Sequence, residues 1–100
     1  MNDLAKCFLK GSDVATRSIL GETIIVPIKG GVGDLNSIYV FNELGTKIWE
    51  LIDGKSSISR MIEKICKVYD VSREEAEKDT VEFLNFLEVS GLIRSISKSV

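Results

Sequence analysis

The apolar pattern of this chain changes its period at Asn42. Before this residue, short runs rich in β-branched residues are separated by turn residues, and after it apolar residues recur every three or four positions. The first pattern is typical of strands and the second of amphipathic helices. A chain of 100 residues has room for one modest core, which both halves must share. The change of period therefore predicts an α+β domain, with a small sheet followed by helices.

Three strands are expected in the first half. Residues 14–19 and 23–28 are separated by a short turn, and residues 38–41 form a third apolar run. Connections this short favour antiparallel neighbours, so we expect a three-stranded antiparallel meander. Residues 29–37 contain three glycines and predict a loop. This loop is not expected to bind phosphate, because Asp34 stands where a P-loop requires lysine.

Three helices are expected in the second half, and each has a capping residue. Asn42 is a favourable N-cap for the first, Ser56 or Ser57 for the second, and Ser72 begins a capping box with Glu75 for the third. The apolar faces consist of Leu44, Ile48, Trp49, Leu51 and Ile52, then Ile58, Met61, Ile62, Ile65, Cys66 and Tyr69, then Ala76, Thr80, Phe83, Leu84 and Leu87. Short turns, the first of which contains Gly54, join the helices and indicate a helix-turn-helix-like bundle, with the meander as a wing. Residues 92–96 could add a small terminal strand.

Composition narrows the classes of function. Histidine is absent, which removes the commonest general base and the commonest metal ligand. The net charge is −2 and the pI about 5.1, whereas nucleic-acid-binding proteins usually carry a basic surface. Cys7 and Cys66 are expected to be free thiols of a cytoplasmic protein, since no signal-peptide core is visible. We expect no metal or cofactor, and an enzyme is the least favoured class because no nucleophile and base can be paired.

Two surfaces are candidates for binding a partner. If residues 38–41 form the edge of the sheet, their unpaired backbone groups could accept an extended peptide as an added strand. Val81 and Phe86 lie off the main apolar face of the third helix, so either that helix is buried over a wider arc or it flanks a groove. The same helix carries six acidic residues and two basic ones. These acids are expected to form a solvated face, although a rim of them beside a groove would attract a basic peptide.

A distinctive string of residues follows the third expected strand. It reads Asn42-x-x-Gly45-x-x-Ile48-Trp49-x-Leu51-x-Asp53-Gly54, with Arg17 before it and the ending Asp79…Phe83-Leu84…Leu87…Gly91-Leu92-Ile93 after it. With these residues, the chain from about 14 to 94 resembles the PqqD family. The resemblance implies a winged helix-turn-helix-like domain that has a three-stranded antiparallel sheet followed by three helices.

The resemblance also implies a function. Members of this family are peptide chaperones, or RiPP recognition elements, which bind the leader of a ribosomally made precursor peptide and present its core to a modifying enzyme, often a radical SAM protein. The leader would add as a strand to the third strand and lie beside the third helix. The peptide-binding residues implied here are Ile38, Tyr39, Val40 and Phe41 on the strand, and Asp79, Val81, Glu82, Phe83 and Phe86 on the helix.

The expected organisation is a single peptide-binding domain over residues 14–96. Residues 1–13 are expected to be an N-terminal extension, with its flexibility left open, and residues 97–100 a C-terminal tail. The expected partners are a precursor leader peptide and a modifying enzyme, with no nucleic acid or membrane, and the protein is expected to be a monomer or weak dimer. Two alternatives remain: a winged-helix DNA-binding regulator, and a structural module that dimerises through the edge strand.

Overall fold

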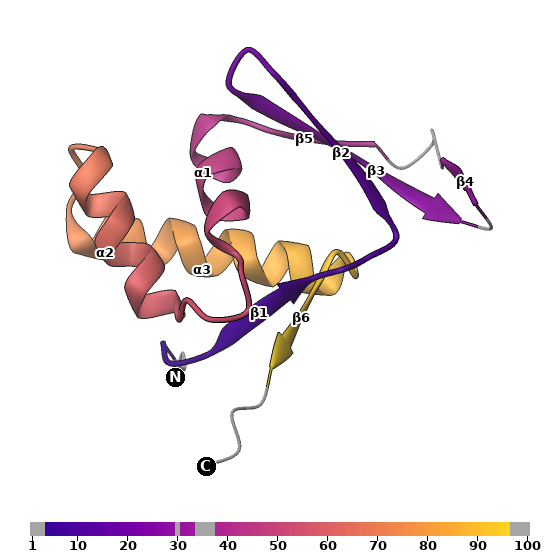
Figure 1. The fold of residues 1–100 in the computed structure, drawn as a ribbon. Coiled ribbons are helices and arrows are strands. Elements are labelled where there is room, and N and C mark those ends of the chain that lie inside the picture. Colours follow the sequence, from indigo (N-terminus) through magenta and orange to yellow (C-terminus); the bar gives the residue numbers. More distant parts are fainter. Residues whose placement is uncertain (1–3, 30, 34–37, 97–100) are drawn as a thin grey trace.

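The computed structural model describes residues 4–29, 31–33 and 38–96 (Figure 1). Its elements are, in chain order, β1 (Cys7–Lys10), β2 (Val14–Ile19), β3 (Glu22–Lys29), β4 (Val32–Gly33), β5 (Tyr39–Phe41), α1 (Glu43–Leu51), α2 (Ile58–Val68), α3 (Arg73–Val89) and β6 (Ile93–Ile96). The predicted α+β order of antiparallel strands followed by three helices is confirmed. Within these described ranges, no helix is both long enough and apolar enough to cross a membrane.

The main sheet is built around β3. On one side β3 pairs with β2 in an antiparallel hairpin, and on the other side its first half pairs antiparallel with β5. The predicted meander is therefore present. The second half of β3 pairs with the short strand β4, which lies within residues 29–37, where a loop was predicted. Gly31 adopts a φ of +80°, which permits the tight reversal between β3 and β4, while residues 30 and 34–37 lie outside the described residues.

A second, two-stranded sheet joins the two ends of the described chain. The predicted terminal strand is present as β6, and its antiparallel partner is β1, with Cys7 opposite Ile96. This differs from the prediction that residues 1–13 are an extension outside the domain, because Cys7 and Phe8 are buried at 0% and 3% exposure. The partner of β1 comes from the far end of the chain, so no local sequence pattern predicts the pairing. Both cysteines are free thiols, as predicted.

The helices begin at the predicted capping residues. Asn42 Oδ1 accepts a hydrogen bond from Gly45 N at 2.9 Å, and the hydroxyls of Ser57 and Ser72 cap α2 and α3 in the same way. Each cap satisfies a backbone amide that has no partner within its helix. The core residues of the three helices are buried together with residues of β3, β5 and both strands of the small sheet; they include Phe8, Ile25, Phe41, Ile48, Trp49, Ile52, Met61, Ile62, Ile65, Leu84, Leu87 and Ile93.

The Asp-Gly pair after α1 shapes the turn into α2. The carboxylate of Asp53 accepts backbone hydrogen bonds from Lys55 at 2.9 Å and Ser56 at 2.7 Å, and these bonds lower the pKa of Asp53. Gly54 adopts a φ of +79°, and a Cβ at this position would lie 2.7 Å from Cδ2 of Leu9. The turn therefore packs directly against β1, which explains why glycine is needed there.

The tip of the β2–β3 hairpin carries a strained and exposed apolar residue. Leu20 has a φ of +51°, a left-handed backbone conformation that costs folding free energy. Its side chain is 98% exposed, so no packing against the described chain offsets this cost. We expect Leu20→Asn to stabilise the protein by about 1 kcal/mol, a part of the roughly 1–2 kcal/mol that left-handed geometry costs a residue with a Cβ. Urea unfolding measures the difference. Leu20→Ala is the matched control, because it removes the same apolar side chain and keeps the strain; equal stability of both variants would refute the strain.

Candidate functional site

Aromatic side chains of the edge strand β5 and of helix α3 meet in an apolar surface, here called the groove, which consists of Tyr39, Phe41, Phe83 and Phe86. The ring of Tyr39 meets that of Phe86 at 5.9 Å, and the ring of Phe41 meets that of Phe83 at 4.9 Å, both edge to face. The earlier residue of β5 contacts the later residue of α3, so the strand and the helix run antiparallel. Phe83 and Phe86 also stack at 6.3 Å, and Phe86 is 47% exposed. These aromatic side chains form a partly open apolar floor beside the strand.

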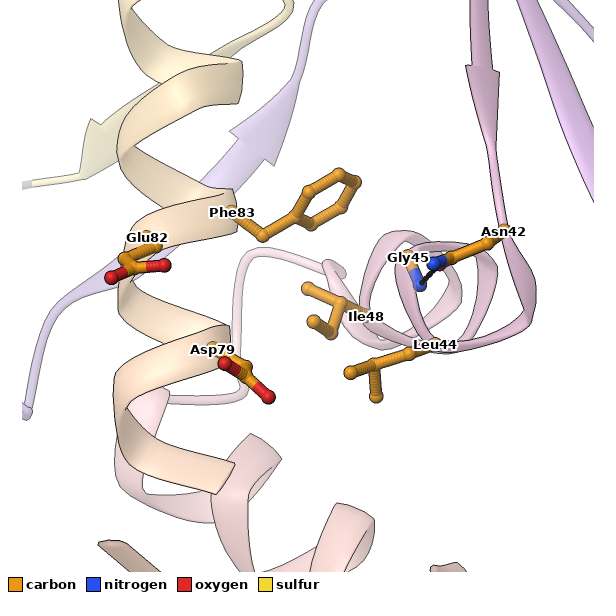
Figure 2. Close-up of a pocket in the computed structure, with 7 residues that line it drawn as sticks. All are labelled: Asn42, Leu44, Gly45, Ile48, Asp79, Glu82 and Phe83. Carbon is orange, nitrogen blue, oxygen red and sulfur yellow. Dashed lines mark hydrogen bonds between the residues drawn. The ribbon is translucent and has the colours of Figure 1, made fainter. Parts of the chain in front are cut away.

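A hollow lies beyond the Phe41 end of β5 and shares Phe83 with the groove. The hollow has a volume of about 300 Å³ and lies between the start of α1 and the middle of α3 (Figure 2). Its lining residues are Asn42, Leu44, Gly45 and Ile48 from the α1 side, and Asp79, Glu82 and Phe83 from α3. This volume equals that of about ten water molecules, since each occupies roughly 30 Å³ in the liquid. The hollow therefore has room for one large side chain.

Gly45 allows the walls of this hollow to approach one another. A Cβ at position 45 would lie 3.1 Å from Cβ of Phe41 and 3.1 Å from Cζ of Phe83. The absence of a side chain thus brings α1 close to both the end of β5 and α3. A buried hydrogen bond of 2.8 Å between the hydroxyls of Thr23 and Thr46 further ties α1 to β3. Together these contacts hold the end of the edge strand in a defined position beside the hollow.

The hydrogen-bonding direction of β3 follows from its hairpin. Ile19 is opposite Glu22 across a two-residue turn, so these two residues form a hydrogen-bonded pair. At the other end of β3, Ile28 N donates to the carbonyl of Asp13 at 2.8 Å. Both observations show that the even-numbered residues of β3 turn their backbone N–H and C=O groups toward β2. The odd-numbered residues, including Thr23 and Ile25, therefore turn their backbone groups toward β5.

This alternation identifies the open backbone groups of β5. Thr23 is opposite Phe41 and Ile25 is opposite Tyr39, so Phe41 and Tyr39 direct their amides and carbonyls toward β3. Val40, which lies between them, directs its N–H and C=O to the other side. Among the described residues, β3 is the only strand that pairs with β5. The Val40 backbone is therefore the point within β5 at which an additional strand could pair.

The structure brings most of the expected site residues together. Tyr39, Phe41, Phe83 and Phe86 contact one another across the groove, while Asp79 and Glu82 line the hollow. Ile38 is exposed and precedes β5, and the side chain of Val40 is 60% exposed. Val81 is not part of this surface. It is 9% exposed and belongs to the core, which agrees with the alternative that the third helix is buried over a wider arc.

The site predicted from the sequence did not include the residues of α1 and its cap that line the hollow. The sequence assigned Asn42 to a cap and Leu44 and Ile48 to the core, and each of them also faces the hollow. Gly45 offered a usable signal, because an isolated glycine inside a helical pattern indicates a close packing contact. Among the described residues, no group of three or more cysteine, aspartate and glutamate side chains is arranged to hold a metal ion.

Comparison with known proteins places this α+β scaffold and its open edge strand in a family. The family model described as Coenzyme PQQ synthesis protein D (PqqD) matches residues 22–93. The protein therefore belongs to the PqqD family. The match starts at the first residue of β3 and ends at the first residue of β6, so it includes the groove and omits β1 and β2.

A solved structure has the same fold. It is described as "TbiB1 in Complex with the TbiA(beta) Leader Peptide", with a TM-score of 0.74 and 21% sequence identity. The alignment covers 90% of this chain and 99% of that one. No curated protein matches the sequence. At this identity the structural likeness establishes the fold, and the predicted α+β architecture is confirmed by it.

Proposed function

We propose that this protein binds the leader of a ribosomally made precursor peptide and presents the peptide to a modifying enzyme. The observation that carries the proposal is the open backbone of Val40 beside an apolar groove. Such an edge supplies hydrogen bonds to any extended peptide, and the groove supplies selectivity for its side chains. Membership of the PqqD family and the leader peptide bound to TbiB1 support this function.

The binding mechanism follows from the alternation of a strand. The leader residue opposite Val40 would exchange two backbone hydrogen bonds with it, and its side chain would face away from the groove. The leader residues on either side of it would turn their side chains toward Tyr39, Phe41 and α3. Each backbone hydrogen bond contributes about 1 kcal/mol. Each buried apolar side chain contributes roughly 1.5–3 kcal/mol, so affinity depends mainly on one or two anchors.

The proposed role is that of a non-catalytic adaptor. Apart from Asn42 and Gly45, the residues of the groove and hollow are aromatic, aliphatic or acidic, which suits the capture of a peptide, and the chemical step would belong to a partner enzyme. The resemblance to the PqqD family suggests a radical SAM enzyme as that partner. Copurification of this protein with a radical SAM enzyme, dependent on the precursor peptide, is the observation that would identify it.

The charge of α3 argues against the DNA-binding alternative. This helix carries Glu74, Glu75, Glu77, Asp79, Glu82 and Glu88 against Arg73 and Lys78. A recognition helix must approach the phosphates of DNA, which an acidic surface repels. The peptide-binding role therefore agrees better with the chemistry of the same helix.

Titration with a leader peptide tests the function directly. The ¹⁵N-labelled protein is mixed with the synthetic leader of a candidate precursor peptide, and amide shifts are followed by NMR. We expect shifts at residues 38–41, at the start of α1 and along α3, and none with a scrambled peptide. Unchanged amides throughout these segments would refute the proposed site. A dilution series without peptide would reveal self-association, which would instead shift residues 39–41 with protein concentration.

A further inference from the structure

We propose that the hollow selects a leader with one large apolar side chain and a lysine or arginine within about two residues of it. This inference rests on the proposed function and specifies the chemistry of the peptide that the groove accepts. It follows from the lining of the hollow, from the charges at its rim and from the direction of β5.

The floor of the hollow is apolar and rigidly supported. Ile48 is 1% exposed and belongs to the central core, while Leu44 and Phe83 are half-buried and pack against that core. The close approach at Gly45 keeps Phe41 and Phe83 in place on the third side. A side chain entering the hollow would remove both its own apolar surface and these partly exposed surfaces from water, which favours a large aliphatic or aromatic anchor.

The rim of the hollow is acidic. Asp79 and Glu82 are three residues apart on α3, both are exposed, and both line the hollow. In Figure 2 the side chain of Asp79 extends from α3 in the direction of Leu44 on α1. None of the residues that line the hollow is basic, and neither carboxylate forms an ion pair within the described part of the chain. A basic side chain at this rim would gain two nearby carboxylates, whereas an acidic one would be repelled.

The register of strand addition determines where the basic residue must be. The hollow lies beyond the Phe41 end of β5, so the anchor is the groove-facing leader residue at that end. The next groove-facing residue lies about 7 Å further along an extended chain. A lysine or arginine there can reach the rim because its long aliphatic stem spans apolar surface while its charge stays in water.

Selection from a displayed library of random 12-residue peptides tests this inference. The library is selected on the wild-type protein and counter-selected on Val40→Pro, so that only peptides that depend on the open backbone remain. We expect these peptides to share a large apolar residue with lysine or arginine enriched within two positions of it. Val40-dependent peptides without this enrichment would overturn the proposed specificity and leave the proposed function standing. Failure to recover any Val40-dependent peptide would overturn both.

Charge reversal gives a second readout on the same selected peptides. Glu82→Lys is expected to shift the selection from basic to acidic neighbours of the anchor. Removing one carboxylate with Glu82→Gln or Asp79→Asn should weaken binding of a basic peptide by about twofold to fivefold, less at high salt. Glu63→Lys is the matched control, because Glu63 is an exposed acid on α2 that does not line the hollow. Equal effects of Glu63→Lys and Glu82→Lys would reduce the preference to net charge and refute a site at the rim.

Discussion

Val40→Pro is expected to weaken leader binding strongly while the protein stays folded. Proline removes the one amide of β5 that faces the open side of the sheet, and its ring occupies the space through which an added strand must approach. The pairing of β5 with β3 survives, because it uses the backbone groups of Tyr39 and Phe41. We expect at least a tenfold loss of affinity, or about 1.4 kcal/mol, measured by calorimetric titration of the leader peptide.

Two companion variants separate the backbone effect from the side chain and from unfolding. Val40→Thr alters the exposed side chain and keeps the amide, so its affinity should remain within about twofold of wild type, a difference below 0.5 kcal/mol. Tyr39→Pro removes an amide that faces β3 and should lower thermal stability as well as binding. Wild-type affinity in a folded Val40→Pro protein would contradict strand addition at β5.

Trp49→Ala is expected to cost about 3–5 kcal/mol of folding free energy. Trp49 is 3% exposed, its ring contacts that of Phe41 at 5.7 Å, and the ammonium of Lys10 lies 5.0 Å from its centroid. It thus links α1 to the end of the edge strand on one side and to the end of β1 on the other. A loss of this size is a large share of the 5–15 kcal/mol typical of a small domain.

Urea unfolding followed by circular dichroism measures this loss, since Trp49 is the only tryptophan and fluorescence is lost with it. Val89→Ala is the control: Val89 is 89% exposed on α3 and its truncation should change stability by less than about 0.5 kcal/mol. A cost below about 1 kcal/mol for Trp49→Ala would show that the ring contributes little more than a surface side chain.

The residues from Asn42 to Gly54 contribute both to the core and to the site. The string from Asn42 to Gly54 contains a cap, a buried tryptophan and two glycines, and the structure gives each a physical role. Its Gly45 admits the close contact that forms the hollow, and its Gly54 admits β1. The string therefore specifies both the core of α1 and the shape of the site beside it.

Local patterns in the sequence determined the class of fold. The β-branched runs, the caps at Asn42, Ser57 and Ser72, and the 3.6-residue apolar period each depend on neighbours a few residues away, so the strands and helices could be predicted one at a time. The position of residues 38–41 as the last strand of the expected meander was compatible with an edge strand. These features are encoded within single segments.

The tertiary structure alone decided what depends on distant partners. The pairing of β1 with β6 joins opposite ends of the chain, and the burial of Val81 depends on how α3 is rotated against its neighbours. The outward direction of the Val40 backbone required the register of two strand pairs, and the hollow required α1, β5 and α3 to meet. Burial and register are properties of contacts between segments, and the pattern of any one segment is compatible with several such arrangements.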